Sequence, residues 1–108
     1  MATGIIKQPE SYEDFAVTSV TVMNQSIPAN EVTGNVSVTA TKAGSYPIGI
    51  VGMNRTGTGS TYANIVTLYI SAKSEGSATI TANARNISTS SAISNLTLSA
   101  GILWMKIK

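Results

Sequence analysis

Residues 77–85 read SATITANAR, and this stretch decides the fold because its side chains alternate in kind at every step. Alanine and isoleucine occupy the even positions from Ala78 to Ala84, and polar residues occupy the odd ones. A period of two is typical of a β-strand with one buried face and one face in water. The same alternation recurs in Phe15–Met23, Asn35–Lys42 and Ile65–Ser71. The sequence therefore predicts an all-β fold.

Turn-forming residues separate these runs, and their spacing predicts how the strands are arranged. We expect turns at Asn24–Ser26, Gly44–Ser45 and Lys73–Gly76, a loop at Asn54–Thr61, and a last long strand over Ile93–Ile107. Strong turn signals recur at intervals of about 8 to 15 residues, which favours an antiparallel β-sandwich, jelly-roll-like, over a propeller or solenoid. Residues 1–12 are predicted to form an N-terminal arm or linker, and residues 13–108 a single sandwich domain.

One predicted strand, Tyr46–Met53, is apolar on both faces. Such a strand is either central in a sandwich or covered on its outer side by another subunit. The chain also holds only one Phe, one Trp and four Tyr in 108 residues, so its core is poor in large rings. Association of identical chains is one way to bury more apolar surface. We therefore predict a homo-oligomer.

Composition excludes several classes of function. The chain has no His and no Cys, and Ser and Thr have no base to activate them, so we predict that it is not an enzyme. A net charge of +2 with scattered Lys and Arg argues against nucleic-acid binding. A calcium site needs several oxygen ligands close together, and the acidic residues Glu10, Glu13 and Asp14 are only a weak candidate for one. We therefore expect no metal and no cofactor. We expect no export signal in the first ten residues and no membrane insertion.

Three side chains are the candidates for contact with a receptor or ligand. Arg55 and Tyr62 bracket the glycine-rich stretch 57–60, and they offer a charge-assisted hydrogen bond and a stacking face. Trp104 is the third candidate, but packing within the sheet competes with ligand contact, and we favour packing. Gly57-Thr58-Gly59 lacks the later glycine, the lysine and the helix that phosphate-binding turns require, so we interpret it as a mobile connection.

Two segments carry a resemblance to a known group of proteins. Tyr46–Gly52 with its following Gly/Thr stretch, and Ala84–Ser88 followed by Leu98–Trp104, resemble C-terminal domains of tail-associated structural proteins from tailed phages and prophages. The resemblance covers Val17–Lys108, and its motifs are hydrophobic.

The resemblance implies a virion protein of the phage tail, such as part of a tail fibre or baseplate. It further implies a homotrimer and a host-recognition role towards a surface glycan or protein. The alternative that the residues leave open is a bacterial cell-surface adhesin or carbohydrate-binding module, which would be extracellular.

Overall fold

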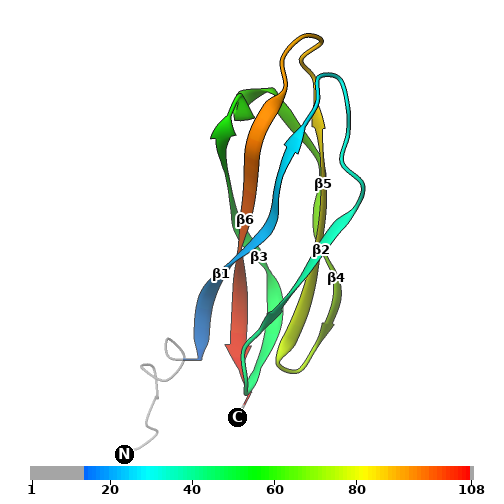
Figure 1. The fold of residues 1–108 in the computed structure, drawn as a ribbon. Coiled ribbons are helices and arrows are strands. Elements are labelled where there is room, and N and C mark those ends of the chain that lie inside the picture. The colour runs from blue at the N-terminus through cyan, green and yellow to red at the C-terminus, as the bar shows by residue number, and fades with distance from the viewer. Residues whose placement is uncertain (1–13, 108) are drawn as a thin grey trace, which may run out of the picture.

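The structure, a computed structural model, describes residues 14–107, with the backbone alone at Ile65. These residues form two three-stranded antiparallel sheets, shown in Figure 1. We call the sheet with the order β1-β6-β3 sheet A and the sheet with the order β2-β5-β4 sheet B. The elements are β1 (Phe15–Ile27), β2 (Val36–Thr41), β3 (Ser45–Thr58), the 3-10 helix η1 (Ser60–Tyr62), β4 (Ala63–Ser74), β5 (Ser77–Asn86) and β6 (Ile93–Lys106).

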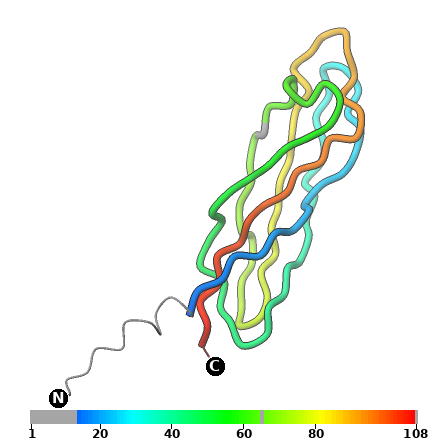
Figure 2. The backbone as a smooth tube through the Cα atoms, turned by 90° about the vertical axis from the view of Figure 1, so that its left-hand side faces the viewer, coloured from blue at the N-terminus to red at the C-terminus, as the bar shows by residue number. Residues whose placement is uncertain are grey.

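The two sheets pack face to face, which confirms the predicted antiparallel β-sandwich. Six strands over the described residues are two fewer than in a jelly roll. Strands of 13 and 14 residues, at about 3.3 Å per residue, make the sandwich long and narrow. We call one end the base, where Phe15 pairs with Met105 and Ser45 with Lys106. In Figure 2 it is the end at which the blue start of β1 and the red end of β6 lie side by side. The opposite end, the tip, carries the connections 28–35, 59–62 and 87–92 (Figure 1).

The core lies between a strand of large side chains and a strand of small ones. Central strand β6 contributes Trp104, Ile102 and Leu98, all without exposed surface. Central strand β5 contributes mainly alanines, of which Ala78 and Ala82 are equally buried. Face-to-face sheets lie about 10 Å apart, so large residues on one require small residues on the other. This pairing lets a chain with few rings fill its core.

The predicted turn at Asn24–Ser26 is wrong, because β1 continues through it to Ile27. Strand β1 pairs with β6 along this whole length, with irregularities between Thr21 and Met23 and between Gln25 and Ile27. Bulges of this kind accommodate an extra residue without ending the strand. Long-range pairing therefore overrides the local turn preference of the polar residues.

The predicted loop at Asn54–Thr61 is also wrong over most of its length. Strand β3 runs to Thr58, and η1 follows directly. Gly57 forms a bulge with φ of 131°, and a Cβ there would lie 2.7 Å from the Asn95 carbonyl oxygen. Glycine is required at this position because the neighbouring strand approaches closely, and the stretch is an ordered strand end.

Strand β3 is an edge strand of sheet A, so Tyr46–Met53 is not central in the sandwich. This rules out the first of the two explanations for its two-sided apolar pattern. The second explanation, a covering subunit, is still open. The arm predicted for residues 1–12, together with Glu10 and Glu13, lies outside the described residues.

Candidate functional site

The outer face of sheet A is apolar near the base. Cross-strand registers arrange it in three rows, each with one position from β1, β6 and β3 in that order. The first row, nearest the base, is Phe15, Met105 and Tyr46; the second is Val17, Leu103 and Gly49; the third is Ser19, Gly101 and Gly52. The bulge residues Ile48 and Val51 of β3 add to the second and third rows. We call these three rows with their bulge residues the apolar face.

Much of the apolar face is open to solvent. Phe15 is 48% exposed, Val17 60% and Val51 54%. Gly101 lies between two of these side chains, since a Cβ on it would be 3.5 Å from Val17 Cγ1 and 3.6 Å from Val51 Cγ2. Nothing lies within 4 Å of the corresponding point at Gly52. The third row is therefore a shallow notch with walls of valine.

The apolar character stops at the next row towards the tip. There Thr21 and Ser99 lie opposite each other and their hydroxyls are 3.5 Å apart, and Asn54 completes the row. The same sheet thus carries an apolar half and a polar half on one outer surface. A continuous apolar region bordered by polar residues is the usual mark of an interaction surface.

The outer face of sheet B is richer in hydroxyl groups, although Tyr69, which pairs with Thr81, is 47% exposed there. Thr81 of β5 shares hydrogen bonds of 2.8 Å with Ser37 of β2 and with Ser71 of β4. One row closer to the base, the hydroxyls of Thr39 and Thr79 are 3.4 Å apart. We call this array the hydroxyl face. Its side chains already bond to one another, so the face holds together across all three strands without a ligand.

At the tip, Asn86 joins three segments of the chain. Its side chain has no exposed surface. Its Nδ2 donates to the carbonyl oxygens of Ile27 at 3.1 Å, Pro28 at 3.2 Å and Ser91 at 2.8 Å. Its Oδ1 accepts from the Ser88 amide at 2.9 Å. A buried amide that is satisfied on both sides fixes its neighbours in one arrangement, so the tip is an ordered structure.

Two of the three predicted contact residues form side-chain hydrogen bonds within the fold, and of these two Arg55 is exposed and Trp104 is buried. Arg55 points from β3 to β4, where its Nη1 donates to the backbone carbonyl of Ala63. Trp104 has no exposed surface, and its Nε1 donates to Thr18 Oγ1 at 2.7 Å. The packing interpretation of Trp104 therefore holds, and its assignment as a contact residue is corrected. Arg55 connects the two sheets at one edge.

Like Arg55, Tyr62 has the expected exposure, at 43%. Its carbonyl accepts a hydrogen bond from the Ile87 amide at 3.1 Å, so the two residues are neighbours at the tip. Ile87 is also exposed, whereas Val32, another exposed residue, pairs with Arg85 along the opposite edge of β5. Tyr62 thus belongs to a small mixed cluster with Ile87 rather than to a mobile loop with Arg55.

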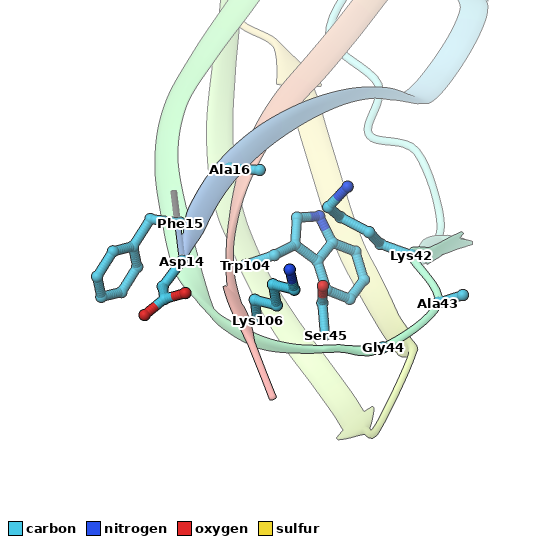
Figure 3. A pocket seen from close by; sticks show the side chains of 9 residues that line it. All are labelled: Asp14, Phe15, Ala16, Lys42, Ala43, Gly44, Ser45, Trp104 and Lys106. Atoms are coloured by element: carbon cyan, nitrogen blue, oxygen red, sulfur yellow. The ribbon is translucent and has the colours of Figure 1, made fainter. Parts of the chain in front are cut away.

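A pocket of about 280 Å³ opens at the base between the start of β1, the β2–β3 turn and the end of β6 (Figure 3). Trp104 forms its floor, and Lys42, Lys106 and Asp14 surround its mouth. Because the indole has no exposed surface, the floor is not open to a ligand. None of the charged groups of the pocket forms an ion pair within residues 14–107. The pocket holds no pair of groups suited to acid–base or nucleophilic chemistry.

No set of three acidic side chains lies close enough to hold a metal ion within the described part of the chain. Among these residues, no helix is long and apolar enough to cross a membrane. No family model matches this sequence, and neither a curated protein nor a solved structure matches it.

The sequence did not identify the apolar face as a surface, although its signal was present. Both faces of β1 near Phe15 and both faces of β6 near Leu103 carry apolar residues. A strand buried on one side only would carry polar residues at those outer positions. The two-sided pattern of Tyr46–Met53 was the third part of the same signal.

Proposed function

We propose that this chain is a non-enzymatic structural protein of a phage or prophage virion, acting as a tail-associated head or host-recognition module. The observation that supports this most is the apolar face, where exposed apolar side chains of β1 and β3 lie together on one outer surface. Exposing Phe15, Val17 and Val51 in water is unfavourable, at roughly 25 cal/mol per Å². A protein that retains such a surface is best understood as one component of a larger assembly.

The remaining features support a structural rather than a chemical role. The groups that could act as acid, base or nucleophile are scattered over the described surface, and the base pocket gathers Asp14, Lys42, Ser45 and Lys106 beside the buried Trp104. The long axis separates an apolar region near the base from an ordered tip that carries Tyr62. A module attached at one end and presenting the other suits a tail component. The hydrophobic resemblance to tail-associated proteins agrees with this assignment.

The test is the location of the protein. Particles induced from a strain that carries the gene are purified by density gradient, and their proteins are measured by mass spectrometry. We expect this chain at a fixed ratio to the tail proteins and gold-labelled antibody at the tail in electron micrographs. Its recovery from the bacterial envelope, with none in the particles, would contradict the proposal and favour the adhesin or carbohydrate-binding alternative.

A further inference from the structure

The three rows of the apolar face differ in size in a way that makes the face complementary to itself. The first row holds the large side chains Phe15, Met105 and Tyr46. The third row holds Gly101 and Gly52 at two of its three positions. The rows are spaced by two residues, about 6.6 Å along the strands. Large residues therefore lie on one side of Leu103 and the notch lies on the other.

We propose that a second copy of this chain covers the apolar face, related to the first by a two-fold axis that passes through Leu103. The axis lies in the plane of contact and runs across the strands. It reverses the order of the rows, so the first row of each copy lies over the third row of the other. Met105 of one copy then fills the notch at Gly101 of the other, and the two Leu103 side chains meet on the axis.

In a two-fold interface each contact occurs twice, and this arrangement meets that requirement because each copy both inserts its first row and offers its third row. Val17 and Val51, which border the notch at 3.5 and 3.6 Å from the Gly101 Cβ position, would hold the entering Met105 on two sides. Methionine is flexible and fits irregular apolar spaces well. No charged side chain lies in the three rows, so neither copy leaves an unpaired charge in the contact.

The extent of the exposed face also fits a single partner. Phe15, Val17, Ile48 and Val51 are each between 44% and 60% exposed, and they lie on the two strands that flank β6. A stable interface takes about 800 Å² from each partner, so a partner must cover all three strands. One partner uses the whole face, whereas a three-fold arrangement would divide it between two neighbours.

The inference goes beyond the proposed function, because the pairing needs no virion. It is tested on the complete chain by light scattering after size exclusion and by sedimentation equilibrium at tens of micromolar. We expect the mass of two copies. The mass of one copy would overturn the proposal, including the case in which another part of the same chain covers the face. The mass of three copies would overturn the two-fold arrangement.

Two variants locate the contact. Gly101→Ala adds one methyl group in the notch at ordinary contact distances from Val17 and Val51, so the monomer should fold unchanged. It should nevertheless raise the dimer dissociation constant roughly tenfold, because the methyl group occupies the space of the partner's Met105. Adding Met105→Ala should recover part of this loss, since the two positions meet across the interface. If the two changes affect the dimer dissociation constant independently, Met105 of one copy does not lie over Gly101 of the other, and the proposed register is wrong.

Leu103→Lys places a charge at the centre of the face and should give monomers at every concentration tested. Its matched control is Thr39→Lys, an outward change at an exposed position on sheet B, which should leave the dimer intact. Circular dichroism and thermal melting establish that each variant folds. A dimeric, folded Leu103→Lys variant would overturn the proposal. Particle localisation remains a separate measurement, so the two conclusions can fail independently.

Discussion

Strands β5 and β6 occupy the same place in their sheets, yet they carry opposite kinds of side chain. On the inner side, β6 supplies large residues such as Trp104 and Ile102, whereas β5 supplies mainly alanine. On the outer side, β6 is apolar at Leu103 near the base, whereas β5 carries hydroxyls such as Thr81. The inner difference is required by packing, because two sheets at about 10 Å must share one core volume.

The outer difference has no such cause. The hydroxyl contacts of Thr81 with Ser37 and Ser71 show that a polar outer surface is compatible with this fold. The apolar outer side of sheet A is the part of the described surface for which we propose a contact. Comparing the two sheets in this way separates residues that specify the fold from residues that specify its contacts. The four predictions that follow test that separation.

The largest effect is expected where the core depends on one side chain of sheet A. Trp104→Ala removes the largest buried side chain and leaves Thr18 without its donor at 2.7 Å. We expect a loss of about 3–5 kcal/mol in the free energy of unfolding, measured by urea titration. The matched change in sheet B, Ala82→Gly, should cost only about 0.5–1 kcal/mol. Equal losses of stability in the two variants would contradict the conclusion that β6 supplies the large core side chains and β5 the small ones.

A smaller but still large effect is expected from the buried amide at the end of β5. Asn86→Asp replaces the Nδ2 donor by an oxygen that faces the carbonyls of Ile27, Pro28 and Ser91. We expect a loss of about 3 kcal/mol at neutral pH, since a buried charge without a partner is strongly unfavourable. The tip would then lose its order while the apolar face near the base remains.

The pH dependence separates charge from lost hydrogen bonds. Burial raises the pKa of the introduced carboxyl above its value in the unfolded chain. The native state therefore holds its proton to higher pH, and the free energy of unfolding should fall as the pH rises from about 4 towards 7. Asn86→Ala, which adds no charge, should lose stability equally at both ends of this range. A pH-independent Asn86→Asp variant would contradict the buried environment.

The same comparison explains which parts of the fold were predictable from sequence. Strand β5 was predicted almost to its ends, because its inner and outer positions differ in kind at every step. Strand β2 was predicted equally well for the same reason. Alternation reports burial on one face, and both strands have one buried and one hydrated face.

Sheet A was harder to predict because its long strands are bulged. The polar run Asn24–Ser26 and the glycines near Gly57 have strong turn preferences, and only pairing with β6 keeps them in strands. That pairing joins residues far apart in sequence, so no local pattern reveals it. The hydrogen bond of Arg55 was missed for the same reason, since its acceptor at Ala63 lies on a strand of the other sheet.

A modest effect is expected at the hydroxyl face. Thr81→Val keeps the shape of the side chain but removes the hydroxyl that joins Ser37 and Ser71 at 2.8 Å. We expect a loss of about 1 kcal/mol, because both partners are exposed and can bond to water instead. Thr79→Val, whose hydroxyl contact is longer at 3.4 Å, is the control and should cost less. A Thr81→Val variant that begins to self-associate would show that the hydroxyls keep sheet B free of contacts.

The smallest effect on stability, and the one most relevant to function, is expected at the tip. Tyr62→Ala removes an exposed ring that forms no side-chain hydrogen bond among the described residues, so the free energy of unfolding should change by less than about 0.5 kcal/mol. Arg55→Ala should lower the free energy of unfolding by about 1 kcal/mol, because it breaks the hydrogen bond with Ala63 that connects the sheets. If the tip contacts a host surface, adsorption to cells or glycans should fall for Tyr62→Ala, because the variant lacks the aromatic ring that would make the contact. For Arg55→Ala, adsorption should fall only by the fraction of the protein that is no longer folded. A Tyr62→Ala protein that folds fully and adsorbs as well as the parent would exclude Tyr62 from the contact and place recognition elsewhere on the sandwich.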